Sequence, residues 1–218
     1  MSTTVKENYL KALYFLDEQD GQINLTELSK QLGVSKPTAN NMVKKLEEHG
    51  WVNYQKYKPV ILTEEGRRTA ALIIRKHRLT EMFLHQVMGF GWEEVHEIAE
   101  QVEHIQSDKL FARMDEMLDY PTVDPHGSPI PNEQGIVIEQ KLQSLTEVPI
   151  GQQVKLLAIA QSSKELLHYL NELQIQLGTT FELLQVEPFD HSLLVRCDDR
   201  APTMISQKVG RSLFVKAL

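Results

Sequence analysis

The sequence predicts a mainly helical protein that ends in a small β-barrel. Apolar residues up to about Asp119 recur at helical spacing, interrupted by one short strand pair, whereas those after about Leu145 gather in short runs typical of strands. Between these regions, Pro121–Pro131 holds four of the nine prolines and predicts a rigid loop without regular helix. We therefore expect three domains, at residues 1–72, 73–142 and 143–218.

The composition is that of an ordinary globular protein and excludes several kinds of site. The 218 residues are 41% hydrophobic and 24% charged, and no apolar stretch is long enough to span a membrane. The N-terminus lacks the order of a signal peptide, so we expect a cytoplasmic protein without membrane contact. Cys197 is the single cysteine, which excludes intramolecular disulfides, cysteine zinc clusters and iron–sulfur centres. Any metal must therefore take oxygen and nitrogen ligands.

The net charge of −7 is distributed unevenly along the chain. Residues 1–72 hold ten Lys and Arg against nine Asp and Glu, whereas residues 73–218 hold thirteen against twenty-one. The acidic excess thus lies outside the N-terminal third. That third remains able to approach the phosphates of a nucleic acid.

Two short helices joined by a tight turn are predicted within the N-terminal third. Asn24 can cap the first, with Glu27 at the capping-box spacing, and Gly33 ends it. Ser35 can cap the second, which Gly50 ends. Its buried side recurs at helical spacing and comprises Ala39, Met42, Val43 and Leu46. Two helices so joined form a helix-turn-helix.

A hairpin with a basic tip follows, which completes a winged helix. The outer face of the second helix mixes lysines that attract phosphates with side chains that can hydrogen-bond base edges, and the hairpin tip adds two more lysines. The candidate DNA-contacting residues are Ser35, Lys36, Pro37, Thr38, Asn40, Asn41, Lys44, Lys45, Lys56 and Lys58. The alternative is a small helical domain with a solvated polar face, but packing alone explains poorly why two lysines and Tyr57 stand at a hairpin tip.

Histidine and glutamate side chains cluster in the middle region. His77 and Glu81 are four residues apart, so on a helix they share a face. At about 100° per residue, a second set falls within an arc of about 100°, opposite an apolar stripe. This set comprises His96, Glu100, Glu103 and His104, and the stripe comprises Val95, Ile98, Ala99, Val102 and Ile105. Carboxylates and imidazoles without thiolate suit Mn(II), Fe(II), Co(II) or Zn(II), with oxygen-rich octahedral geometry favouring Mn(II). A solvated helix face is the alternative, and spacing alone leaves both open.

Taken together, these motifs resemble the diphtheria toxin repressor family of iron- and manganese-dependent transcriptional repressors. The resemblance spans the chain and rests on ENYLKALYFL, LTELSKQLGVSKPTANNMVKKLEEHGWV, RKHRLTEMFL, VHEIAEQVEH and DPHGSPIP. The C-terminal module is similar to the SH3-like domain of the longer members. The resemblance implies a winged helix that reads an inverted repeat, a helical domain that forms a homodimer, and two metal sites.

The resemblance also implies the ligand sets of the two sites. The ancillary site would use His77, Glu81 and His96, joined by Gln161 from the C-terminal domain. The primary site would use Glu100, Glu103 and His104 with a ligand from the first helix, where this chain has Asn8 in place of the family's methionine or aspartate. Two further departures are Lys11, at a position where the manganese branch can supply a glutamate, and Ala158, at the place of a carboxylate.

We therefore expect a metal-dependent repressor of metal-uptake genes that binds double-stranded DNA as a homodimer. The resemblance implies Mn(II) or Fe(II) as the effector, with Co(II), Ni(II) or Zn(II) as substitutes in vitro and no organic cofactor. Two alternatives stay open, a DNA-binding regulator of the same fold that responds to a non-metal signal, and a metallohydrolase. The second lacks an HExxH spacing and leaves the winged helix without a role.

Overall fold

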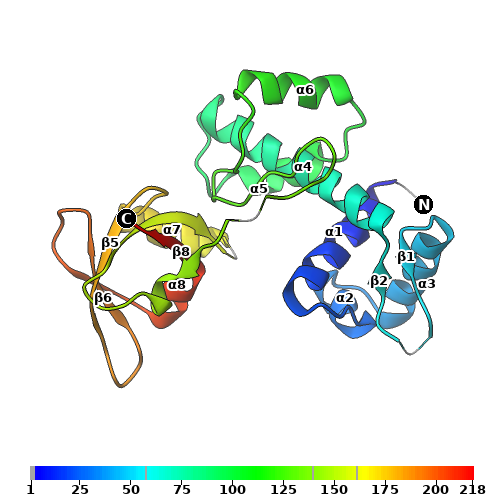
Figure 1. The fold of residues 1–218 in the computed structure, drawn as a ribbon. Helices are drawn as coiled ribbons and strands as arrows, with labels where there is room; N and C mark the ends of the chain where they lie inside the picture. The colour runs from blue at the N-terminus through cyan, green and yellow to red at the C-terminus, as the bar shows by residue number, and fades with distance from the viewer. Residues whose placement is uncertain (1–2, 57, 139, 161) are drawn as a thin grey trace. The chain divides into compact units, whose positions relative to one another are not determined.

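The computed structural model describes residues 3–56, 58–138, 140–160 and 162–218 (Figure 1). Two compact units make up the chain. The first contains residues 1–80, 99–114 and 130–138, and the second contains residues 81–98, 115–129 and 139–218. Each has its own apolar core. Among the helices described, none combines the length and the apolar content that a membrane span requires.

The N-terminal part of the first unit is a winged helix-turn-helix. It comprises helices α1 (Thr3–Asp20), α2 (Leu25–Gln31) and α3 (Lys36–Glu48), followed by the antiparallel strands β1 (Val52–Asn53) and β2 (Ile61–Leu62). The predicted caps are present, since the side chain of Asn24 accepts from the Glu27 amide and that of Ser35 from the Thr38 amide. Leu10 and Leu13 of α1 pack with α2 and α3 in one core.

Three helices occupy the middle of the chain, where the sequence predicts a helical region. They are α4 (Glu64–Gln86), α5 (Val95–Val102) and α6 (Asp108–Met117). The start of α4 lies directly against the end of α3 and the hairpin, because a Cβ atom at Gly66 would come within 1.9 Å of the Trp51 carbonyl oxygen. Only glycine permits this approach. The proline-rich residues 121–131 contain no helix, as predicted.

The C-terminal part of the second unit is a six-stranded antiparallel sheet. Its strands are β3 (Gln143–Ser144), β4 (Gln153–Ile159), β5 (Thr180–Val186), β6 (Leu193–Cys197), β7 (Thr203–Ile205) and β8 (Leu213–Ala217), in the order β3-β8-β4-β5-β6-β7. The sequence predicts strands in VKLLAIA, FELLQVEP, SLLVRC and SLFVKAL around a helix at Lys164–Gln174, and helix α7 (Lys164–Glu172) ends two residues earlier than this. The short strands β3 and β7, the 3₁₀ turn Leu145–Glu147 and helix α8 (Gln207–Ser212) are additions to that pattern.

Candidate functional site

His77, Glu100 and Glu103 form a first cluster inside the first unit. One ligand atom from each lies within 4.8 Å of the other two, and His77 Nδ1 lies 2.6 Å from Glu103 Oε2. His77 projects from α4, Glu100 lies on α5, and Glu103 follows α5 directly. The Glu103 side chain is 0% exposed, a burial that carboxylates tolerate only with charged or hydrogen-bonding partners.

A lysine ammonium group lies among the carboxylates of this first cluster. Lys11 of α1 donates to Glu100 Oε1 at 2.5 Å and to the two Glu103 oxygens at 2.8 and 2.9 Å. Burial raises the pKa of Glu103, but the hydrogen bond with His77 and the charge of Lys11 outweigh it, so the pKa lies below its ordinary value. Glu103 is therefore an anion at neutral pH.

Asn8 lies one turn before Lys11, on the same side of α1. Its Oδ1 atom is buried and has no hydrogen-bond partner among the described residues. A buried acceptor without a donor costs about 1–3 kcal/mol, and a bound cation would remove that cost. Asn8 lies inside α1 (Thr3–Asp20), so it does not cap the helix.

His104 is held by a carboxylate that the sequence patterns did not indicate. Its Nδ1 atom lies 2.6 Å from Glu7 Oε2, and Gln106 donates to Glu7 Oε1 at 3.1 Å. Because a carboxylate only accepts, Nδ1 carries the proton, so in a neutral ring Nε2 would be free to bind a metal; Nε2 lies 3.5 Å from Glu103 Oε1. A carboxylate behind a histidine in this way orients many metal-binding imidazoles.

The helical wheel misplaces Ile105 but not Glu103. The Glu103 amide still bonds to the Ala99 carbonyl four residues back, and its carboxylate lies beside Glu100 and His77 on the ligand side. Helix α5 ends at Val102, and the Ile105 amide bonds to the Val102 carbonyl three residues back. The turn tightens there, so Ile105, which was predicted in the apolar stripe, is 43% exposed.

Glu81, Asp124 and His126 form a second cluster inside the second unit, and all three are buried. His126 Nδ1 lies 3.9 Å from Glu81 Oε2 and 4.0 Å from Asp124 Oδ1. Its Nε2 atom lies 2.8 Å from the Trp92 carbonyl oxygen, which accepts only, so Nε2 carries the proton. In a neutral ring, Nδ1 would therefore offer a lone pair close to two carboxylates, an arrangement that suits a shared cation.

The loop that carries Asp124 and His126 is fixed by its own backbone and by strand β4. Asp124 Oδ1 accepts from the His126 and Ser128 amides at 2.8 and 2.9 Å. The Ile159 amide donates to the His126 carbonyl at 2.8 Å. Gly127 has φ +85°, and a Cβ atom there would lie 2.0 Å from the Leu157 carbonyl oxygen. The second cluster is thus attached to the C-terminal sheet.

The ligands implied for the ancillary site divide between the two units. His77 belongs to the first unit, where it pairs with Glu103. Glu81 and His96 belong to the second unit, where His96 Nδ1 lies 3.2 Å from Glu81 Oε1. Gln161 lies outside the described residues, and Ala158 is part of β4. Asp124 and His126 were missed as site residues, although both lie in the quoted DPHGSPIP motif.

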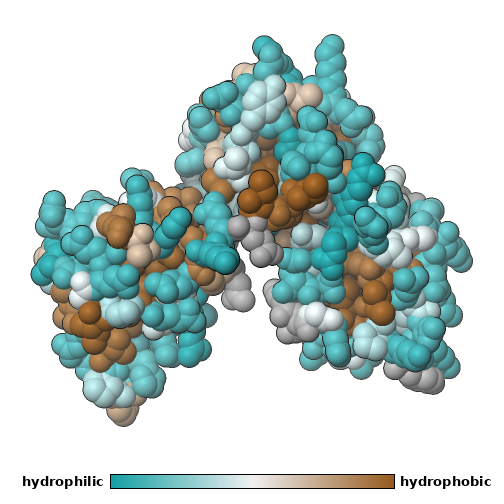
Figure 2. Space-filling model, viewed as in Figure 1, coloured by the Kyte–Doolittle hydropathy of each residue, from teal (hydrophilic) through white to brown (hydrophobic). Residues whose placement is uncertain are grey.

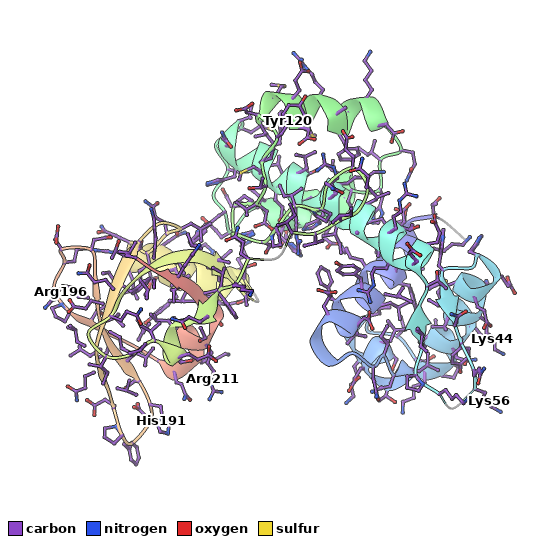
Figure 3. All side chains as sticks on the ribbon, in the orientation of Figure 1. Lys44, Lys56, Tyr120, His191, Arg196 and Arg211 are labelled. Atoms are coloured by element: carbon purple, nitrogen blue, oxygen red, sulfur yellow. The ribbon has the colours of Figure 1, made fainter. Side chains whose placement is uncertain are left out.

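The candidate DNA face lies on α3 and the β1–β2 loop. Figure 3 shows Lys44 of α3 and Lys56 of the loop on one side of the winged helix. All the residues predicted for this face are exposed except Asn40, which is partly buried. Asn40 Oδ1 accepts from the Tyr54 hydroxyl at 2.6 Å, and the Ser35 and Thr38 hydroxyls bond to each other at 2.8 Å. The bond from Tyr54 to Asn40 therefore connects α3, the candidate recognition helix, to the β1–β2 hairpin that forms the wing. Tyr57 lies outside the described residues.

Comparison with known proteins assigns the chain to a family. Residues 1–60 match the iron dependent repressor N-terminal DNA binding domain, residues 63–132 its metal binding and dimerisation domain, and residues 143–217 the FeoA domain. The iron-dependent repressor IdeR of Mycobacterium tuberculosis is 36% identical over 155 residues, which cover 68% of this chain and 67% of that protein. The diphtheria toxin repressor of Corynebacterium efficiens is 30% identical over 188 residues, 82% of each chain.

Solved structures agree with this assignment. A manganese-dependent transcriptional repressor in complex with manganese has a TM-score of 0.88 at 33% identity, covering 98% of this chain and 100% of that chain. The repressor ScaR with bound Cd²⁺ has a TM-score of 0.81 at 32% identity, covering 98% of this chain and 99% of that chain. The metallohydrolase alternative has no support, because these relatives are transcriptional repressors. The chain belongs to the iron-dependent repressor family of metal-dependent, DNA-binding transcriptional repressors, in the form that carries a C-terminal FeoA domain of SH3-like type.

Proposed function

We propose that this repressor is a homodimer that Mn(II) or Fe(II) activates for binding to an inverted-repeat operator of metal-uptake genes. The observation that carries the proposal is the donor set beside α1, the helix whose apolar side is part of the winged-helix core. It combines the amide oxygen of Asn8, which no described residue contacts by a hydrogen bond, with the buried carboxylate of Glu103 and its imidazole partners. A cation held there would join the DNA-binding region to the helical region.

The donor chemistry favours hard or borderline divalent ions. Carboxylate, amide and imidazole donors without a thiolate suit Mn(II) and Fe(II) better than soft metals. Cys197 is 3% exposed in the core of the C-terminal domain, and burial raises the pKa of its thiol to about 11. It is therefore no source of a thiolate ligand. Co(II), Ni(II) and Zn(II) accept the same donors and are expected to substitute in vitro.

Two centres are included in the proposal. In the first, Asn8, Glu100, Glu103 and His104 would hold the ion, with Glu7 fixing the His104 ring and His77 supporting Glu103. In the second, Glu81 and His96 would do so, with Asp124 and His126 added from the same unit to the implied ligands. When bound, the metal supplies positive charge that several carboxylates share.

The activating step is a coupling between metal and DNA binding. Residues of α1 belong to the winged helix, whereas Glu100, Glu103 and His104 belong to the segment around the end of α5. Holding both sets of donors on one ion restricts the orientation of the recognition helices in a dimer. When the two recognition helices are held at the spacing of successive major grooves, the affinity for DNA rises, typically by about 5- to 150-fold.

The test is DNA binding measured by fluorescence anisotropy against an inverted-repeat library, with each divalent metal and with a chelator. We expect Mn(II) or anaerobic Fe(II) to raise the affinity for a subset of sequences, and Lys58→Ala to lower the salt-dependence slope by about one without changing sequence preference. Asn41→Ala should instead relax preference at one base position. Equal affinity with every metal and with chelator would overturn the metal-dependent proposal.

A further inference from the structure

The Lys11 ammonium group contacts the same oxygens that the first centre would offer to a metal. Its Nζ atom lies 2.5 Å from Glu100 Oε1 and 2.8 and 2.9 Å from the Glu103 oxygens. The Lys11 side chain is 12% exposed and that of Glu103 is 0% exposed, so water screens this interaction weakly. These contacts all lie inside the first unit.

This arrangement meets the electrostatic requirement of the carboxylates without a metal. The buried carboxylate of Glu103 and the partly exposed carboxylate of Glu100 repel each other, and the positive charge of Lys11 offsets that repulsion. The neighbouring Asn8 Oδ1 has no hydrogen-bond partner within the part of the chain that the structure describes, so Lys11 compensates the two anions but does not contact this neutral oxygen. A divalent ion could satisfy both, with twice the charge.

We propose that Lys11 is an internal competitor of the metal at the first centre and thereby sets the metal concentration at which the repressor responds. The inference rests on the proposed function. An ammonium group and a divalent ion cannot share the same carboxylate oxygens at contact distance, since their like charges would repel. Binding of the ion therefore requires the lysine to leave, and its flexible four-carbon stem allows it to do so.

Competition of this kind predicts a distinct result when a substitution removes the charge at position 11. Lys11→Met keeps the length and apolar character of the stem and removes only the ammonium group. The variant should be less stable without metal, because Glu100 and Glu103 lose their compensating charge, yet it should bind metal more tightly. If Lys11 merely supported the fold, its substitution would lower both the stability of the apoprotein and the affinity for metal.

The experiment is isothermal titration of Mn(II) into the full-length apoprotein, with thermal melting of the apo and Mn(II)-loaded forms. We expect Lys11→Met to lower the apparent dissociation constant of one site on the order of tenfold or more. It should also lower the apo melting temperature and widen the stabilisation by Mn(II). Lys11→Gln, which keeps a polar end, should shift the dissociation constant in the same direction and provides the test should the methionine variant fold poorly.

Lys6→Met is the matched control, because Lys6 is on the same helix and its ammonium group contacts His49 rather than the cluster. It removes one positive charge from α1 and should leave the Mn(II) affinity unchanged. Unchanged or weaker Mn(II) binding by both Lys11 variants would overturn the inference. Absence of Mn(II) binding by the wild-type protein would instead overturn the proposed metal function, so the two failures are distinguishable.

Discussion

The two carboxylate–histidine clusters are built on different supports. In the first, side chains from three helical segments converge, and the positive charge among them comes from Lys11 of α1. In the second, Asp124 and His126 lie on a proline-rich loop that a turn and strand β4 hold in place. The first depends on balanced charge among buried groups, whereas the second depends on backbone geometry. Substitutions that remove charge should therefore act on the first, and substitutions that disturb the loop should act on the second.

The largest effect is expected at Glu103. Glu103→Gln keeps the shape of the side chain but removes the anion that His77 and Lys11 both contact. Removing one partner of a buried ion pair costs about 3–5 kcal/mol, so the apoprotein should lose about this much stability in a urea titration, and metal binding at the first centre should disappear. The exposed Glu97 of α5 provides the control, and Glu97→Gln should change neither quantity. A Glu103→Gln variant as stable as wild type would contradict the charge-balance account.

The second cluster should respond to a single added methyl group. Gly127→Ala would place a Cβ atom 2.0 Å from the Leu157 carbonyl oxygen, at a φ of +85°. Gly151→Ala is a matched control, because its φ is +84° and nothing lies within 4 Å of the added atom. Backbone strain alone should cost about 1–2 kcal/mol at both positions, and Gly127→Ala should cost clearly more.

The same glycine pair separates the two clusters by metal binding. Gly127→Ala should weaken one class of Mn(II) site and leave the other intact, whereas Gly151→Ala should leave both intact. Titration calorimetry with the two variants measures this directly. Equal losses in both variants, or loss of both sites in Gly127→Ala, would show that the loop does not act on the second cluster alone.

A smaller effect is expected from the residue behind His104. Glu7→Gln keeps a hydrogen-bonding group near His104 Nδ1 but removes the negative charge that orients the imidazole. Loss of such a partner typically weakens metal binding by about 10- to 100-fold, and we expect the lower end because the amide oxygen still accepts. Glu7→Asp keeps the charge, but its Mn(II) affinity should stay below that of wild type, because the aspartate side chain is one methylene shorter. An unchanged Mn(II) affinity in Glu7→Gln would limit Glu7 to a structural role.

The smallest change is expected from strengthening the first centre at position 8. Asn8→Asp adds an anion where Oδ1 has no hydrogen-bond partner among residues 3–56, 58–138, 140–160 and 162–218. The Mn(II) concentration for half-maximal DNA binding should fall by roughly fivefold, since affinity for hard ions rises with ligand charge. Asn8→Met should instead favour Fe(II) or Co(II) over Mn(II), because a thioether is a softer ligand. Activation curves that superimpose on wild type for all three metals would exclude Asn8 as a ligand.

Much of the fold was predictable because its signals are local. The Asn24 and Ser35 caps, the glycines after α2 and α3 and the basic hairpin are all encoded within a few neighbouring residues. The long strands of the C-terminal sheet also have clear apolar patterns. Strands β3 and β7 have only two and three residues, too few for any periodicity to appear.

The clusters were only partly predictable because their contacts join distant segments. Glu100, Glu103 and His104 share one short sequence motif, but the bonds from Lys11 and Glu7 cross 89 or more positions. Helical spacing also misplaced Ile105, because the turn tightens after Val102. Asp124 and His126 lie in a loop, where no periodicity marks a face. Their signal was the Asp-Pro-His-Gly turn itself.

The surface of the molecule does not reveal the two clusters. Figure 2 shows a largely hydrophilic surface with separate small apolar patches on the visible face. The buried cluster residues Glu81, Glu103, Asp124 and His126 contribute little to such a surface. Composition and surface polarity therefore give no indication of them.

The most direct test of the account is the metal dependence of DNA binding by His104→Ala. The His104 side chain is 12% exposed and its Nε2 atom faces Glu103, so its loss should abolish activation by Mn(II) or Fe(II) while the apoprotein stays folded. The exposed His85 of α4 provides the control in His85→Ala. We predict operator affinity that no longer changes with metal in His104→Ala and responds normally in His85→Ala. A His104→Ala protein that metal activates like wild type would contradict the proposal that the first centre controls the repressor.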